Sequence, residues 1–376
     1  MGHERNLHDL SSVRSRRVRI SVDSSPLYDL LLVMWSVFGA DDKAESHSVG
    51  KDWFENFRKQ LSPETLRVAS RASAFGELWV ALLPIVATAP DRSIDAAIAW
   101  LEAADPVWLR ESLLSEKFCD VTPEIRVAAA RGQEDAVATI LAEASTLKMD
   151  EDFCKSLESF LELPATEVIP PLVEAMRRVR SEAFAEYEEE WAAAQARDAA
   201  ARQPAIDGSG SIKDLIESIT NGIAYDIPQG VRRVVFIPSV SLRPWTLITD
   251  HDDALLVCYP VAEEHLVMDP EAPPSALLAV YKALGDDKRM RLLRKLSEGP
   301  ATLAELTEHV GMAKSTVFHH MAVLRAAGLV RVLFVDGQVS TYGLRLGSIP
   351  DHASLLTQYL NPLPAHTGTK AQGATK

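Results

Sequence analysis

The chain of 376 residues lacks the features that mark exported, membrane-spanning and disulfide-stabilised proteins. It has only three cysteines, Cys119, Cys154 and Cys258, which lie far apart and form no CxxC pair. We expect them to be reduced thiols of a cytoplasmic protein. No run approaches the roughly 18 apolar residues of a membrane span. No apolar stretch follows the basic residues near the start, which argues against a secretory signal.

The sequence also lacks the short motifs that carry catalysis. It contains no GxSxG, HExxH or GxxxxGK[ST] pattern, and no glycine-rich phosphate loop follows a strand. Asp250-His251-Asp252-Asp253 has the composition of a metal or catalytic cluster. These residues lie between two β-rich runs that a hairpin turn must connect, however, and Asp favours turns. We therefore interpret them as a turn. We therefore expect no enzyme activity, no metal site and no cofactor.

What the sequence does contain suits a folded protein of several domains. Hydrophobic residues make up 47% of the chain and charged residues 24%, and the length exceeds what one core normally organises. The net charge of −14 at first argues against a nucleic-acid partner. Between Ser275 and Arg345, however, ten Lys or Arg oppose six Asp or Glu, so one basic stretch lies in an otherwise acidic chain.

The first half of the chain is predicted to be helical. Amphipathic stretches are separated by polar-then-proline helix starts such as Ser24-Ser25-Pro26 and Asp105-Pro106. Pro171–Gln203 is predicted as one long helix, whose acidic patch is either a solvated face or part of a dimer or lever helix. The tryptophans are interpreted as core residues, with an aromatic effector pocket as the alternative.

Three β-rich runs follow, at Val231–Ile237, Trp245–Ile248 and Ala254–Tyr259. We expect a small antiparallel meander, joined by Val18–Val22. The fold class is therefore predicted to be mainly α. The expected regions are an N-terminal helical domain (1–205), a small β-rich connecting region (206–272), a DNA-binding domain (273–347) and a C-terminal helix with a disordered tail (348–376).

The DNA-binding prediction depends on residues 275–346, where local signals agree. Helices are predicted over Ala276–Leu284, Lys288–Leu296, Leu303–Val310 and Ala313–Ala327. Thr302 and Glu305 form a capping box at the start of the third helix, and Gly311 permits the tight turn after it. Leu329–Val335 and Val339–Leu344 form a hairpin across Asp336-Gly337. Four helices followed by a hairpin predict a winged helix-turn-helix.

The fourth helix is the candidate reader of DNA. Val317, Met321 and Leu324 recur at helical spacing and are expected to face the core. The residues then expected to face outwards are Lys314, Ser315, Phe318, His319, Ala322 and Arg325. Such a helix fits the major groove, and the hairpin can reach flanking phosphates. The predicted DNA-binding residues are Lys314, Ser315, Thr316, Phe318, His319, Arg325, Arg331 and Gln338. His319-His320 is not interpreted as a metal pair, because adjacent helical side chains point about 100° apart.

These motifs carry a resemblance to a known family. Ala283–Leu293 (ALGDDKRMRLL), Ser315–Met321 (STVFHHM) and Leu324–Val330 (LRAAGLV) resemble the corresponding segments of ArsR/SmtB-type regulators. The resemblance covers about seventy residues. It implies a homodimer of winged helix-turn-helix modules that usually represses transcription and is released by a metal or another signal.

The sequence departs from that family in two respects. Phe318 stands where members often have a serine, so a contact to a thymine methyl replaces a hydrogen bond. The family's metal ligands are also missing, because Thr302–Val310 contains no cysteine and Asp351-His352 are adjacent rather than spaced. The resemblance therefore implies DNA binding but no metal sensing. It also implies a dimer, whose predicted surfaces are Ala276–Leu284 and Ser354–Leu360.

The sequence therefore predicts a cytoplasmic repressor that binds double-stranded DNA as a homodimer on an inverted repeat, without a membrane partner. Three hypotheses for the N-terminal domain remain. It senses a small-molecule effector, it is a protein-interaction module of an adaptor with a fixed DNA address, or it is an enzyme fused to a DNA module. The absence of catalytic motifs favours the first two.

Overall fold

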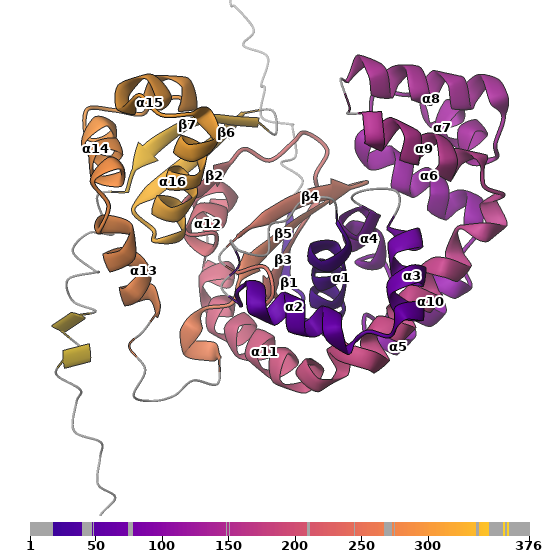
Figure 1. The fold of residues 1–376 in the computed structure, drawn as a ribbon, viewed down its shortest axis with the longest axis horizontal. Coiled ribbons are helices and arrows are strands. Elements are labelled where there is room, and N and C mark those ends of the chain that lie inside the picture. The colour runs from indigo at the N-terminus through magenta and orange to yellow at the C-terminus, as the bar shows by residue number, and fades with distance from the viewer. Residues whose placement is uncertain are drawn as a thin grey trace, which may run out of the picture. The chain divides into compact units, whose positions relative to one another are not determined.

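The computed structural model describes residues 18–39, 47, 49–73, 78–147, 149, 151–208, 211–243, 245–266, 273, 275–335, 338–345, 356–357 and 359–360. The chain forms two compact units, each built from two stretches of sequence. Unit 1 comprises Met1–Gly208 and Ile227–Val261, and unit 2 comprises Ser209–Asp226 and Ala262–Lys376. Both are mainly helical, as predicted (Figure 1). Within the described ranges, no helix has the length and apolar character needed to span a membrane.

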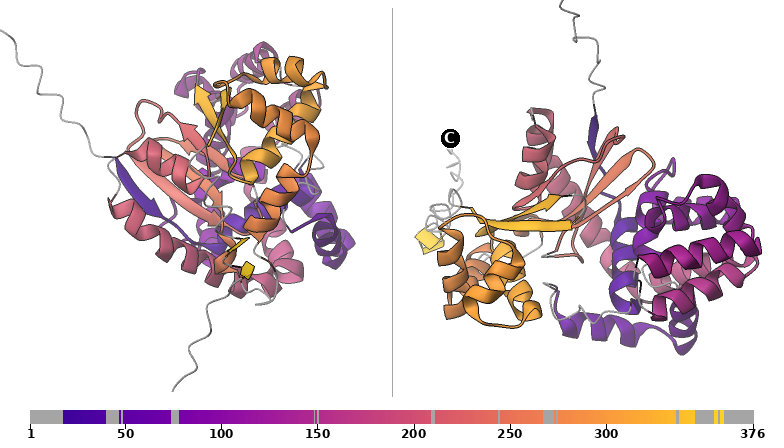
Figure 2. Two further views of the ribbon diagram at one scale, coloured as in Figure 1. Left: turned by 90° about the vertical axis from the view of Figure 1, so that its left-hand side faces the viewer. Right: turned by 90° about the horizontal axis from the view of Figure 1, so that it is seen from above.

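Unit 1 begins its helices where the sequence predicts polar-then-proline starts. Ser25 caps α1 (Pro26–Phe38), Ser62 caps α3 (Pro63–Ala72) and Asp105 caps α6 (Pro106–Lys117), each through a side-chain oxygen that accepts a backbone N–H. The other short helices are α2 (Lys51–Gln60), α4 (Leu78–Val86), α5 (Ile94–Glu102), α7 (Pro123–Ala130), α8 (Glu134–Thr146) and α9 (Glu151–Glu162). Consecutive helices from α6 to α9 pack on one another as a separate stack (Figures 1 and 2).

The helix predicted over Pro171–Gln203 is longer than expected and is interrupted by a π-helical turn. α10 (Ile169–Val179) leads into π-helical residues Arg180–Phe184, and α11 (Ala185–Gly208) continues beyond Pro204. Glu182 in the π turn accepts hydrogen bonds from the backbone N–H of Ser62 (2.7 Å) and from the Thr65 hydroxyl (2.6 Å). The π turn therefore places a carboxylate at the N-terminus of α3, where the helix dipole favours it.

The strands of unit 1 form one sheet in the order β1-β3-β5-β4. β1 (Arg19–Val22), β3 (Arg233–Ser239) and β5 (Ala254–Pro260) are parallel, and only β4 (Leu247–His251) is antiparallel to its neighbour β5. The participation of the first strand is confirmed, but the predicted antiparallel meander is wrong. Nearly every residue of β5 is buried, which is typical of a parallel strand covered on both faces and requires helices around it.

A buried carboxylate joins three elements of unit 1. Asp29 of α1 is fully buried and accepts hydrogen bonds from the Gln195 amide of α11 (2.7 Å) and from the Ser239 hydroxyl at the end of β3 (2.6 Å). The backbone N–H groups of Val240 (2.9 Å) and Ser241 (3.0 Å) and the Ser241 hydroxyl (2.5 Å) complete the set. Burial raises the pKa of Asp29, and these donors oppose that shift.

Unit 2 contains the predicted C-terminal helices together with a piece of chain from upstream. Its elements are α12 (Ile212–Ile219), β2 (Ile223–Tyr225), α13 (Ser275–Leu284), α14 (Asp287–Leu296), α15 (Leu303–Val310), α16 (Lys314–Ala326), β6 (Val330–Val335) and β7 (Gln338–Leu344). The strands form a sheet in the order β2-β6-β7. The residues expected to form a separate region, 206–272, are thus divided between the two units, because β2 pairs with the hairpin while β3, β4 and β5 pair with β1.

Candidate nucleic-acid interface

The turn between α15 and α16 is defined by local features that the sequence predicts. The Glu305 carboxylate accepts the backbone N–H of Thr302 (2.7 Å), and the Thr302 hydroxyl accepts the backbone N–H of Glu305 (3.3 Å), which confirms the capping box. α15 ends at Gly311 with φ 66°, a left-handed conformation that glycine adopts without strain. The next helix starts three residues later, at Lys314.

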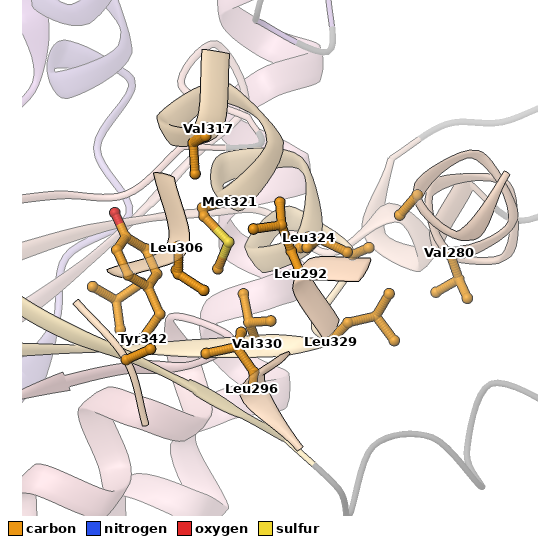
Figure 3. Packing of buried hydrophobic residues seen from close by; sticks show 14 residues of the cluster. Val280, Leu292, Leu296, Leu306, Val317, Met321, Leu324, Leu329, Val330 and Tyr342 are labelled. Atoms are coloured by element: carbon orange, nitrogen blue, oxygen red, sulfur yellow. The ribbon is translucent and has the colours of Figure 1, made fainter. Parts of the chain in front are cut away.

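The buried face of α16 matches the prediction. Val317, Met321 and Leu324 have no exposed side-chain surface and lie in one cluster with Leu306 of α15 and Tyr342 of β7 (Figure 3). This cluster is the core of unit 2 around the helix-turn-helix. Because it fixes which side of α16 is covered, it also fixes which side is presented to solvent.

Five of the predicted DNA-binding residues share the exposed side of α16. Lys314, Ser315, Thr316, Phe318 and His319 are all exposed, and half of the Phe318 surface is accessible. Ala313 precedes the helix without supplying a side-chain cap, so the first-turn N–H groups point outwards beside Lys314. A helix start of this kind, with a lysine next to it, is suited to a phosphate oxygen.

The prediction that Arg325 faces outwards on α16 is wrong. Its side chain is 8% exposed, and Ala322 is buried as well. Both lie in the second half of α16, which packs on β6, and the guanidinium interacts electrostatically with Tyr342 of β7. Burial lowers the pKa of Arg325 to about 10. The helical period identifies the core stripe but does not reveal that the hairpin covers the flank beside it.

His320, the inner member of the His319-His320 pair, is packed beside the core. It is 9% exposed, and its Nδ1 has no hydrogen-bond partner among the described residues. Burial lowers its pKa, opposed by the nearby Asp286 carboxylate. His319 remains exposed next to Phe318. The two rings are thus in different environments.

The hairpin after α16 is the predicted wing. β6 and β7 pair antiparallel from Val330↔Leu344 to Val335↔Gln338, and Asp336-Gly337 at the predicted turn lies outside the described residues, as does the Gln338 side chain. Arg331 is half-exposed and lies 3.9 Å from the Glu217 carboxylate of α12. The sequence alone gave no reason to place Glu217 there.

The two predicted dimer surfaces are described to different extents. On α13, Leu277, Val280 and Ala283 are buried in the unit, whereas Leu278, Tyr281 and Leu284 are exposed large apolar side chains. Of Ser354–Leu360, only residues 356, 357, 359 and 360 are described, and Tyr359 and Leu360 are exposed. In the described parts of the chain, no three His, Cys, Asp or Glu residues are grouped so that they could hold a metal ion.

Helices α13 to α16 with the β6–β7 hairpin define a winged helix-turn-helix domain. Residues 286–332 match the family described as "Bacterial regulatory protein, arsR family". This stretch is an ArsR-family helix-turn-helix domain, which confirms the family resemblance inferred from the sequence motifs.

Curated relatives match over the same small share of the chain. HTH-type transcriptional regulator CmtR of Mycobacterium tuberculosis is 36% identical over 69 residues, which are 18% of this chain and 58% of CmtR. Transcriptional repressor SdpR of Bacillus subtilis is 27% identical over 82 residues, 22% of this chain and 90% of SdpR. HTH-type transcriptional regulator NmtR of M. tuberculosis is 38% identical over 52 residues, 14% of this chain and 43% of NmtR. No solved structure is significantly similar to the chain.

The chain thus spans little more than half the length of the CmtR proteins that it matches. All three relatives are named transcriptional regulators or repressors. Unit 1 lies entirely outside the matched family region.

Proposed function

We propose that the protein is a sequence-specific DNA-binding transcription regulator that represses its targets as a cytoplasmic homodimer. The observation that carries this proposal is the exposed face of α16, where Lys314, Phe318 and His319 lie on a helix fixed by a buried core. The name of SdpR, a transcriptional repressor, supports the direction of regulation. The basic balance of residues 275–345 supports a DNA partner.

A dimer would place two copies of α16 in successive major grooves about 34 Å apart, so the operator should be an inverted repeat. The exposed Leu278, Tyr281 and Leu284 of α13 offer an apolar surface for the second copy. Analytical ultracentrifugation at micromolar concentration is expected to show a dimer. A monomer at that concentration would contradict the two-fold operator.

The contacts of α16 predict two different kinds of mutant. Lys314→Ala should weaken binding to all DNA sequences and reduce the slope of log K against log salt by about one unit, because one phosphate contact is lost. Phe318→Ala should relax the preference at one base position, because an apolar contact to a thymine methyl is lost. Fluorescence anisotropy across a salt series, together with selection of bound sequences, measures both effects.

Lys59→Ala is the matched control for Lys314→Ala, since Lys59 is an exposed lysine of α2 in unit 1. It should leave both affinity and slope unchanged. If Lys314→Ala and Phe318→Ala lost affinity and base preference alike, the assignment of phosphate and base contacts on α16 would be wrong.

We further propose that any signal enters through unit 1, because α15 has no cysteine pair of the arsenic-sensor type. A small-molecule effector is the first candidate, and an adaptor with a protein-binding unit 1 and a fixed DNA module is the second. A thermal-shift screen of metabolites and ions against the full chain separates them. The full chain is required because the β3–β5 strands at residues 233–260 complete the sheet of unit 1.

A further inference from the structure

Residues 211–226, here called the α12–β2 segment, precede the family region by about sixty residues but are built into the wing. β2 lies parallel to β6 in the register Ile223↔Val332, Ala224↔Leu333 and Tyr225↔Phe334. The rings of Tyr225 and Phe334 are 6.0 Å apart. An isolated two-stranded hairpin is marginally stable, and its outer edge is open to other strands. The α12–β2 segment therefore supplies the third strand that completes the wing.

Gly222 brings the backbone of this segment into direct contact with the wing. Its carbonyl accepts the backbone N–H of Val332 (2.8 Å), and its φ is 112°. A Cβ at this position would lie 2.9 Å from the carbonyl oxygen of Val330 and 3.3 Å from the Cα of Arg331. Only glycine fits both this conformation and this approach.

Asn221 lies near the end of α16, the proposed DNA recognition helix, where this helix meets the wing strands β6 and β7. Its side chain accepts a hydrogen bond from the Arg345 guanidinium, just after β7. A Cβ at Gly328, which follows α16, would lie 2.9 Å from the Asn221 amide nitrogen, so the amide packs on that turn. Asn221 itself has φ 57°, a left-handed conformation that asparagine tolerates better than most residues. One side chain therefore touches the end of α16 and the end of the wing.

The α12–β2 segment also faces the two wing cations. Arg331 lies beside Glu217, and Arg345 beside Asn221. These arginines flank the start of β6 and the end of β7, on neighbouring strands that pair Arg331 with Gly343. Their guanidinium groups are thus oriented by residues that no helix-turn-helix motif contains.

We propose that Asn221 and Gly222 are positioning residues of the DNA-binding module, which set the wing and its arginines relative to the recognition helix. The inference rests on the proposed function, since the wing matters to activity only if unit 2 binds DNA. The segment is continuous in sequence with unit 1 at both ends, through α11 on one side and β3 on the other.

Gly222→Ala in the full-length protein tests the backbone contact. The added Cβ should push β2 away from β6, so amide exchange over residues 330–335 should become about tenfold faster. Affinity for operator DNA should fall by about tenfold, because the wing and Arg331, one of the predicted DNA-binding residues, lose their fixed position. Hydrogen exchange followed by mass spectrometry, and fluorescence anisotropy with labelled operator DNA, measure the two effects.

Gly230→Ala is the matched control. Gly230 also has a positive φ, 103°, but a Cβ there would meet no atom within 4 Å. It should leave exchange in β6 unchanged and DNA affinity within about twofold, because strain alone does not move the wing. Asn221→Gly keeps the left-handed conformation and removes the side-chain amide. It should weaken DNA binding while circular dichroism shows unchanged helix content. This second variant tests the same role if Gly222→Ala does not fold.

Unchanged exchange over residues 330–335 in Gly222→Ala, or wild-type DNA affinity in both Gly222→Ala and Asn221→Gly, would overturn the positioning role. Wild-type protein that binds no DNA would overturn the proposed function instead. In that case faster exchange in Gly222→Ala would still identify the α12–β2 segment as the third strand of the wing.

Discussion

Replacing Asp29 by alanine should destabilise unit 1 by at least about 1–3 kcal/mol, the cost of leaving one buried hydrogen-bond donor unsatisfied, because several donors lose their acceptor together. Five donors converge on this carboxylate, from Gln195, Ser239, Val240 and Ser241. Without it the Gln195 amide keeps a second acceptor, the Pro238 carbonyl (3.1 Å), but the donors of Ser239, Val240 and Ser241 lose the carboxylate while they remain buried. Each donor left unsatisfied carries a desolvation cost. α1, α11 and the end of β3 would lose their common anchor.

Tryptophan fluorescence during urea unfolding measures this loss cleanly. All seven tryptophans lie within the sequence of unit 1, so the signal does not report on unit 2. Asp52→Ala is the matched control, because Asp52 is an exposed aspartate in the first turn of α2, as Asp29 is in the first turn of α1. A loss below about 1 kcal/mol for Asp29→Ala would mean that the donors find other partners.

Met321→Ala should destabilise unit 2 by about 2–5 kcal/mol, because it leaves a cavity in a core that cannot fully collapse. Met321 has no exposed surface and lies between Val317 and Leu324 on α16 (Figure 3). The cavity would loosen the helix that we propose to read DNA. Hydrogen exchange in α15 and α16 should accelerate, and operator binding should weaken with it.

Met290→Ala provides the comparison for the same chemical change at the surface. Met290 is 49% exposed on α14. Its replacement should change stability by no more than about 0.5 kcal/mol. Equal destabilisation by the two substitutions would contradict the burial pattern of unit 2.

The helix-turn-helix could be predicted from the sequence because its signals are local. The capping box at Thr302, the left-handed Gly311 and the alternation in the hairpin each depend on a few neighbouring residues. The outward face of α16 was predicted less well. Lys314 and Phe318 are exposed as expected, but Arg325 is covered by the hairpin, and periodicity along one helix carries no information about its neighbours.

The strands of residues 206–272 show what local patterns leave open. The strands β3, β4 and β5 were predicted to exist, but the antiparallel meander predicted for them was wrong, and β2 was not predicted. A β-rich run in the sequence does not indicate which strand it pairs with. β5 pairs with β3 in parallel over seven positions, whereas β2 leaves the same stretch of sequence and pairs with the wing. A continuous apolar run such as Ala254–Tyr259 was the one signal that favoured a parallel, doubly covered strand.

By itself, the sequence determined that the chain is mainly helical and that residues 286–332 are an ArsR-family helix-turn-helix domain. Both depend on interactions between residues close in the chain. Only the tertiary structure decided that Asp29 joins α1 to residues more than 160 positions away, and that Asn221 and Gly222 complete the wing. These contacts form between distant segments when buried polar groups and strand edges find partners, and no local spacing encodes them.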